Sequence, residues 1–408
     1  MAGQVELEAG GTQEGGAPTP AADGSRTKGS GSGPGGNFRF YDNRQNYLLF
    51  VNTCSEKWVV AERVARELDL IEPQQPAIRF FDAGIGDGTI LARVIRQMHR
   101  RYERLPFFIA GKEISLEDIR LFLDKVPDRL FEHPEMVIAI TNISYADAPW
   151  LRPSKPEAAK RMVWKEVALK GTTSADFERQ IQELQPFLAE NWTTTVSEKT
   201  GSMIPETPTV LVLYREDCRF LLDQVIPRRD EPRADYDLVL ASQPFRLRAS
   251  IEFKARRVLA PLARALRAGG RLLGIHSAGS DPGMEIVQRV WPGEDPFVTS
   301  RHQLVEATRG ALGAESKDYV FDPLPAARAL FRYEMHTLPD EIDRESASIG
   351  TSTLLAAWNA AVYVAQIEDD RVTTAMSGPE YLEATRAVLR KYGELWFNDE
   401  SYVIARSR

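Results

Sequence analysis

The sequence predicts an α/β protein with a doubly wound sheet of seven strands. Apolar runs of strand length alternate with stretches of helical spacing, and they lie at residues 78–81, 106–110 and 135–140. Two further runs of this kind, at 236–240 and 271–275, follow a long interruption. Strands that alternate with helices favour a mostly parallel sheet with both faces covered.

The composition is that of an ordinary globular protein. The chain has 408 residues, of which 43% are hydrophobic and 27% are charged, and its net charge is -7. An acidic balance disfavours non-specific binding to nucleic acid. Cys54 and Cys218 have neither metal nor disulfide spacing, which fits a reducing compartment. Without a membrane-length apolar run or a signal segment, we expect a cytoplasmic protein.

Three regions differ in composition and pattern. Residues 1–36 hold 11 of the 28 glycines and no aromatic residue, so we expect a disordered tail. The core is expected to span 37–150 and 235–408. The roughly 85 residues at 151–234 are too many for a simple connection, so they predict an α+β insertion that shapes a substrate pocket or a dimer surface.

An aromatic segment at 38–47 precedes the first strand. Within it, Tyr41, Arg44 and Tyr47 either fold over a ligand or pack the first helix onto the sheet, and the sequence leaves both interpretations open. Ser55 follows as the predicted N-cap of the next helix.

A glycine-rich turn joins the first strand to a helix at 89–102. It contains two acids and three glycines at alternate positions, namely Asp82, Gly84, Gly86, Asp87 and Gly88. Glycine allows positive φ and lets a ligand lie against the backbone. The new helix presents unpaired N–H groups and the positive end of its dipole to that ligand.

This turn resembles motif I of the class I S-adenosylmethionine (SAM)-dependent methyltransferases. The resemblance implies that the glycines and Asp87 contact the cofactor, and that Asp82 holds its ammonium group directly or through water. Dinucleotide folds instead use G-x-G-x-x-G, whose last glycine would fall at Thr89. An acid at position 82 is also a poor neighbour for a pyrophosphate, so a nicotinamide oxidoreductase is disfavoured.

The next two strand ends carry further cofactor candidates. Glu113 lies 31 residues after Asp82, and the resemblance implies that its carboxylate accepts both ribose hydroxyls. Asn142 ends the third strand, where the resemblance places the adenine contact. Asp147 is the alternative for that contact.

The strand at 236–241 ends in Ser242-Gln243-Pro244-Phe245, which resembles motif IV of the amino-methylating branch of the family. The resemblance carries to Ser242, Pro244 and Phe245, whereas Gln243 replaces the commonest proline. A hydroxyl or carbonyl there can orient the lone pair of an amine, and an aromatic face can stabilise the forming cation. The alternative is a strand-to-loop turn with a core phenylalanine.

A helix at 251–266 and a glycine turn at 268–270 lead into the fifth strand, which ends near His276. His276 is a candidate base that removes a proton from the substrate, although a lone histidine is more often structural. Asp281, in the loop that follows, could pair with a substrate amine.

The remaining elements are expected outside the cofactor motifs. Early in the chain, a helix is expected at 116–126. In the insertion we expect helices at 156–168, 174–190 and 216–225, and a hairpin that pairs 192–197 with 207–214. In the C-terminal part we expect helices at 284–290, 302–312, 350–365 and 379–391, and strands at 330–338 and 395–405.

Together these features predict a SAM-dependent methyltransferase that acts on a nitrogen of a small molecule or of a protein side chain, rather than on nucleic acid. No metal site is expected, and a homodimer is compatible with the apolar C-terminal helices. Two alternatives stay open. One is a non-catalytic SAM-binding regulatory protein, and the other is an aminopropyl transferase of the spermidine synthase type.

Overall fold

The computed structural model describes residues 44–197, 203–336 and 349–408. The tail predicted at 1–36, the hairpin turn predicted at 200–202 and Tyr41 lie outside these ranges. Within the described ranges, no helix is long and apolar enough to cross a membrane.

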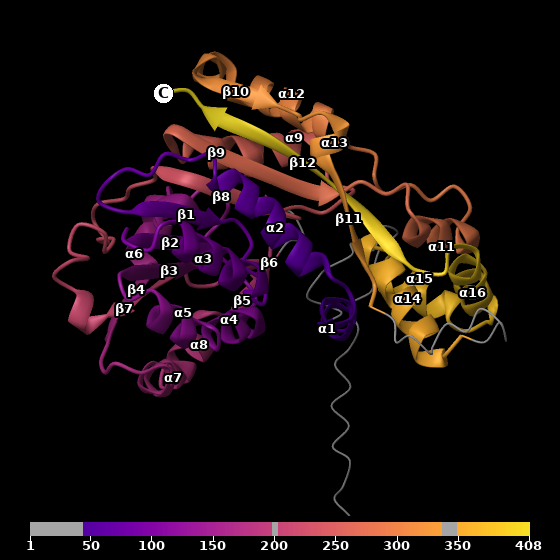
Figure 1. Ribbon diagram of the computed structural model, residues 1–408, viewed down its shortest axis with the longest axis horizontal. Coiled ribbons are helices and arrows are strands. Elements are labelled where there is room, and N and C mark those ends of the chain that lie inside the picture. Colours follow the sequence, from indigo (N-terminus) through magenta and orange to yellow (C-terminus); the bar gives the residue numbers. More distant parts are fainter. Residues whose placement is uncertain (1–43, 198–202, 337–348) are drawn as a thin grey trace, which may run out of the picture. The chain divides into compact units, whose positions relative to one another are not determined.

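One ten-stranded sheet forms the centre of the described chain (Figure 1). The strand order is β10-β12-β9-β8-β1-β2-β3-β7-β4, and β11 also pairs with β12. The strands are β1 (Ile78–Asp82), β2 (Phe107–Lys112), β3 (Met136–Thr141), β4 (Val163–Leu169), β7 (Thr209–Arg215), β8 (Tyr236–Ser242), β9 (Leu266–Ser277), β10 (Tyr319–Asp322), β11 (Leu330–Glu334) and β12 (Trp396–Arg406).

The order of the strands defines where a ligand can bind. Strands β3, β2, β1, β8 and β9 are parallel, and β12 runs antiparallel to β9. The chain builds outward from β1 to β3 and later returns to β8 on the other side of β1. Such a reversal is a topological switch point, and open α/β sheets bind ligands there, outside the carboxyl ends of the strands. This arrangement confirms the predicted doubly wound, Rossmann-like sheet.

Helices cover both faces of the sheet. Along β1, Phe80 belongs to the apolar cluster on one face and Phe81 to the cluster on the other. Helices that contribute to the first cluster are α2 (Glu56–Leu68), α3 (Thr89–Arg101), α4 (Leu116–Leu123), α5 (Val126–Glu132), α7 (Ser174–Gln182) and α8 (Gln185–Asn191). The second cluster includes a π-helix (Lys254–Leu259) that follows α9 (Ile251–Phe253), together with α10 (Ala260–Arg264) and α12 (Arg301–Leu312). Every residue of β1, β2 and β3 is buried, as expected for parallel strands between two helical layers.

A third apolar cluster lies among helices that do not run along the sheet. Its helices are α1 (Arg44–Thr53), α11 (Pro282–Val290), α14 (Thr351–Val364), α15 (Asp369–Ala375) and α16 (Glu380–Tyr392). In Figure 1, α11 and α14–α16 gather beyond the end of β11. A short helix, α13 (Ala326–Ala329), precedes β11.

The insertion extends the sheet instead of forming a separate layer. Strand β7 pairs antiparallel with β3, and β4 pairs parallel with β7. The helix predicted at 156–168 is wrong, because α6 (Pro156–Arg161) ends early and β4 follows. The β-branched and aromatic residues Val163, Trp164 and Val167 favour a strand there.

Three further expectations in the insertion need correction. The hairpin consists of β5 (Thr194–Val196) and β6 (Met203–Pro205), whereas the segment predicted as its second strand is β7 of the main sheet. Only a 3-10 turn, Glu216–Cys218, forms where a helix was predicted at 216–225. The helix predicted at 174–190 is two helices, and the second begins with Pro186 in its first turn, where proline is tolerated.

Elsewhere the predicted elements agree with the structure apart from their ends. The helix predicted at 116–126 is divided into α4 and α5, and α1, α13, α15 and β10 were not predicted. The last two residues of the strand predicted at 330–338 lie outside the described ranges. Ser55 precedes α2, but its hydroxyl makes no cap hydrogen bond and instead accepts the Glu334 N–H at 2.9 Å.

Stability is expected to depend on pH through His133. Its Nε2 lies 3.0 Å from the Leu105 carbonyl oxygen, its Nδ1 lies 3.0 Å from His99 Nδ1, and its ring stacks on Phe107 at 3.7 Å. Burial lowers the pKa of His133 to about 4 from its usual 6.5. The unfolded chain therefore binds more protons between these pH values, and the free energy of unfolding falls as the pH drops through this window.

We predict that this effect reaches about 2 kcal/mol near pH 4.5. Urea denaturation at pH 7, 5.5 and 4.5 measures the effect. Between pH 7 and pH 4.5, His133→Phe should lose less free energy of unfolding than wild type does, by about this amount. The exposed His302→Gln serves as the control and should keep the wild-type dependence. An undiminished loss in His133→Phe would contradict the assignment.

Candidate functional site

Four of the predicted site residues lie where parallel strands end at the switch point. Asp82 is the last residue of β1, and Ser242 is the last residue of β8. Glu113 follows β2 directly, and His276 is the last residue but one of β9. The carboxyl ends of these adjacent strands therefore bring the four residues to one edge of the sheet.

The strand register shows which side chains share a face at this edge. Asp82 lies beside Leu240, and Ser242 lies beside Ile275. Because side chains alternate along a strand, Asp82 and Ser242 point to the same face as Leu240 and Ile275. His276 follows Ile275 and points to the opposite face.

The three glycines of the turn differ in whether the fold requires them. Gly86 and Gly88 have positive φ values of 55° and 78°, and a Cβ at Gly88 would overlap Phe122. Gly84 has no positive φ, and a Cβ there would meet nothing within 4 Å. Neither backbone strain nor packing within the described chain therefore requires glycine at 84, although the Gly84 N–H binds Asp82.

Asp82 is a buried acid with little compensation. It is 2% exposed, and its Oδ1 accepts the Gly84 N–H at 3.2 Å. Burial raises the pKa of Asp82 to about 7, and the charge of Glu113 adds to this, whereas the Gly84 hydrogen bond and the charge of Lys57 oppose it. A cation at this position would favour the ionised carboxylate.

Glu113 holds the glycine turn against the end of β2. Its Oε2 accepts the Gly86 N–H at 2.9 Å, and its Oε1 accepts the N–H groups of Ile114 and Ser115 at 2.7 and 2.9 Å. A carboxylate offers about four acceptor positions, so one remains, on Oε2. Both oxygens of Glu113 were expected to accept ribose hydroxyls. While the turn keeps this conformation, Oε2 is the oxygen that can accept one.

Asp87 is engaged within the turn itself. The Tyr47 hydroxyl lies 3.4 Å from both Asp87 Oδ1 and Asp87 N, and the Thr89 hydroxyl donates to Oδ2. Lys125 Nζ donates to the Asp87 carbonyl at 2.8 Å. Helix α1 thus places Tyr47 over the glycine turn, whereas Tyr41 and the side chain of Arg44 lie outside the described part of the chain.

Asn142 serves as a link to the insertion. Its Nδ2 donates to the carbonyls of Asn191 and Thr207 at 3.3 and 2.9 Å, and its Oδ1 accepts the Thr209 N–H at 2.8 Å. With 1% exposure and these partners, its amide is directed to the backbone of the insertion. Asp147, the alternative, is half-buried and accepts a hydrogen bond from Ser144.

Tyr145 is a candidate that the sequence reasoning missed. Its ring lies 4.5 Å from Lys112 Nζ, at the end of β2. Burial raises the pKa of Tyr145, and the charges of Glu113 and Asp82 add to this. The sequence feature that could have identified Tyr145 is its position in the loop after β3.

Gln243 connects three strands at the edge. Its φ is positive, at 48°, and its N–H donates to the Ile275 carbonyl at 2.9 Å. Its Nε2 donates to Ser277 Oγ at 3.0 Å and to Asp399 Oδ1 at 3.3 Å. The residue that departs from the motif IV pattern therefore holds the ends of β8, β9 and β12 together.

The two residues that follow Gln243 are directed into the protein. Pro244 and Phe245 are buried, and Phe245 belongs to the apolar cluster of the second face. The Phe245 ring lies 5.2 Å from Lys254 Nζ. A cation of the chain itself therefore contacts the ring that was predicted to face a substrate cation.

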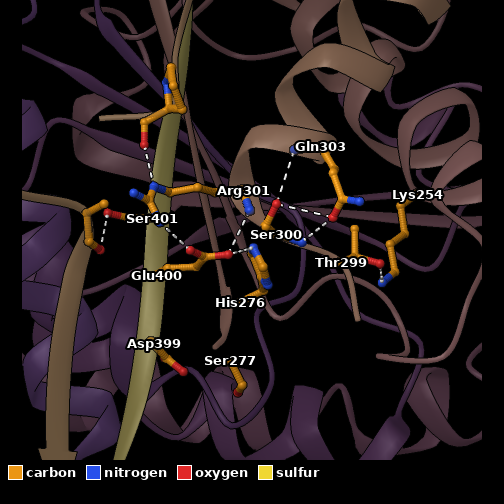
Figure 2. Close-up of polar contacts among 12 residues, drawn as sticks. Lys254, His276, Ser277, Thr299, Ser300, Arg301, Gln303, Asp399, Glu400 and Ser401 are labelled. Carbon is orange, nitrogen blue, oxygen red and sulfur yellow. Dashed lines mark hydrogen bonds and ion pairs between the residues drawn. The ribbon is translucent and has the colours of Figure 1, made fainter. Parts of the chain in front are cut away.

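His276 belongs to an ion-pair network (Figure 2). Its Nε2 lies 3.2 Å from Glu400 Oε1, and Arg301 binds Glu400 through its backbone N–H and Nη1, each at 2.7 Å. Burial raises the pKa of Glu400, but His276 and Arg301 outweigh burial and lower this pKa to about 2. With 3% exposure, His276 fits the structural role that the sequence left open.

A second group of buried charges lies near the same edge and was not predicted. Lys57 Nζ lies 3.3 Å from Glu56 Oε2 at the start of α2, and it lies 5.6 Å from the centre of the Tyr47 ring. Asp399 of β12 is fully buried. Within the described ranges, no group of three or more histidine, cysteine or acidic residues is arranged to hold a metal.

No family model and no curated protein matches this chain. Several solved structures do. A Galdieria sulphuraria protein solved as a sarcosine dimethylglycine methyltransferase shares 9% identity over 86% of each chain, with a TM-score of 0.35. Loganic acid methyltransferase with S-adenosylhomocysteine (SAH) shares 10% identity over 92% of this chain and 98% of its own, with a TM-score of 0.33. Geranyl diphosphate methyltransferase with SAM shares 12% identity over 85% of each chain, with a TM-score of 0.31.

The glycines should differ in their effects on stability. We predict that Gly88→Ala lowers the free energy of unfolding by about 2 kcal/mol or more, because alanine is strained at this φ and overlaps Phe122. Gly84→Ala should stay within about 0.5 kcal/mol of wild type. Urea denaturation of both variants tests this difference. Equal losses would show that Gly84 is required by the fold.

Proposed function

We propose that this chain is a SAM-dependent methyltransferase. The observation that carries the proposal is the pair formed by Asp82 and Gly84 at the switch point of the sheet. Asp82 is a buried acid whose raised pKa a cationic ligand would lower again, and Gly84, whose N–H binds Asp82, would direct a side chain into space that no described residue fills.

The residues present suit this cofactor better than a dinucleotide. Asp82 would hold the ammonium group, Gly84 would allow the ligand to approach the backbone, and Glu113 Oε2 would accept a ribose hydroxyl. Tyr145 would contact the base. When bound, the cofactor supplies an electrophilic methyl group on a positively charged sulfur. The carboxylates of Asp82 and Glu113 would repel a pyrophosphate at the same edge.

A nitrogen atom is the proposed methyl acceptor, on a small molecule or a protein side chain. Ser242 is half-buried and shares a face with Asp82, so its hydroxyl is available to accept an N–H and orient the lone pair. Pro244, Phe245 and Gln243 fix the loop that carries it. His276 has a positioning role in this proposal, because it faces Glu400 on the opposite side of the sheet.

Binding of the cofactor should depend on the ionisation of Asp82. We predict that calorimetric titration gives micromolar binding of SAM and SAH and no binding of NAD. Below the Asp82 pKa of about 7, the affinity should rise with pH, because the cation needs the ionised carboxylate. Asp82→Asn should bind at least about tenfold more weakly and lose this pH dependence.

Asp69→Asn is the matched control, because Asp69 is exposed and pairs with Arg101 at the surface. It should bind as the wild type does. If the folded wild-type protein binds neither sulfur ligand, the proposed function is wrong.

Gly84 provides an independent test of the same site. We predict that Gly84→Ala keeps wild-type stability but binds SAH at least about tenfold more weakly, because its methyl group takes the space beside Asp82. Calorimetry with SAH measures the affinity. A variant that keeps full affinity would remove Gly84 from the site.

A further inference from the structure

A second unpaired acid lies along the same edge of the sheet, three strands away from Asp82. Asp399 pairs in register with Ser277, the last residue of β9, and the pairing of Ser401 with Ile275 sets the facing. Asp399 is two residues from Ser401, so it points to the face that Ile275 shares with Ser242 and Asp82. Strand spacing places it roughly 14 Å from Asp82.

The carboxylate of Asp399 has few partners for its depth. It is 0% exposed, and Oδ1 accepts the Gln243 Nε2 at 3.3 Å. Oδ2 is buried and has no hydrogen-bond partner among the described residues. Figure 2 shows Asp399 beside Ser277 and separate from the network of His276, Glu400 and Arg301.

The nearest charges do not neutralise this acid. Burial raises the pKa of Asp399 well above its usual range, and the charges of Glu56 and Asp281 add to this, against hydrogen bonds from Ser277 and Gln243. Glu56 has Lys57 at 3.3 Å. Both oxygens of Asp281 accept backbone N–H groups, from Met284 at 2.8 Å and Asn398 at 3.0 Å. Asp399 is thus the member of this group that no cation of the described residues compensates.

From this geometry we propose that Asp399, with Gln243 and Ser277, forms the subsite that binds a positively charged amine of the methyl acceptor. The proposal rests on the proposed function, because it takes the acceptor to lie between Ser242 and the end of β12. A buried carboxylate without a cationic partner is costly, and an ammonium group supplies both the charge and the donors that Oδ2 lacks. The ammonium of the cofactor at Asp82 lies too far away to serve here.

This subsite determines the class of acceptor. A cationic amine is attracted, a neutral isostere gains no ion pair, and a carboxylate is repelled by Asp399, Glu56 and Asp281. The chain should therefore select amines over carboxylic acids of the same size.

Calorimetry with the full chain saturated with SAH tests the selection. The probes are three molecules of similar shape: n-butylammonium, n-butanol and butyrate. We expect wild type to bind n-butylammonium at least about tenfold more tightly than either of the others. Equal binding of n-butanol or butyrate would overturn the proposal. This comparison needs no variant.

Asp399→Asn then locates the effect. It preserves the shape and removes the buried charge, so n-butylammonium should bind at least about tenfold more weakly while SAH binds as in wild type. Asp69→Asn, which changes an exposed acid that pairs with Arg101, is the control and should keep n-butylammonium binding. If SAH binds but Asp399→Asn binds the amine like wild type, the subsite is wrong. If SAH does not bind to wild type, the proposed function fails and the subsite fails with it.

Discussion

The candidate site depends on one carboxylate, that of Glu113, which joins the glycine turn to the sheet. It accepts N–H groups from Gly86 on one side and from Ile114 and Ser115 on the other. Hydrogen bonds to an ionised acceptor are about twice as strong as neutral ones, so the turn after β1 and the start of the next loop are fixed together. The hydrogen bond from the Gly86 N–H to Glu113 holds the turn in the conformation in which Gly84 has open space and Asp82 is buried.

At the carboxyl ends of the parallel strands, the buried charges on the two faces of the sheet have different partners. On one face, Glu400 is neutralised by Arg301 and lies against His276, so the charges hold β9, β12 and α12 together. On the other face, no lysine or arginine of the described ranges forms an ion pair with Asp82 or Asp399, although the charge of Lys57 lowers the pKa of Asp82. An ion pair within the chain is a structural link, whereas a buried acid without one is available to a cationic ligand.

Features that depend on residues close together in the sequence could be predicted from it. Continuous apolar runs predicted β1, β2 and β3, and the glycine spacing located the turn after Asp82. Features that depend on distant residues were missed. The helical spacing at 156–168 concealed β4, which forms because β7 offers it a partner. Nothing near Asp399 marks it in the sequence, since its role arises only when β12 pairs beside β9. His276 was predicted as a catalytic base from its residue type. The pairing of β9 with β8, however, directs its side chain to the face opposite Asp82.

The position of β12 in the chain has a consequence for the timing of biogenesis. Asp399 lies in the last strand, at Trp396–Arg406, and that strand is inserted between β9 and β10. A ribosome releases the N-terminal part first, so the glycine turn and β1–β3 can form while the C-terminal segment is still inside the exit tunnel. The edge of the sheet that carries Asp399 is completed only after Trp396–Arg406 has left the exit tunnel. A truncated or nascent chain would therefore lack Asp399 while its glycine turn was already in place.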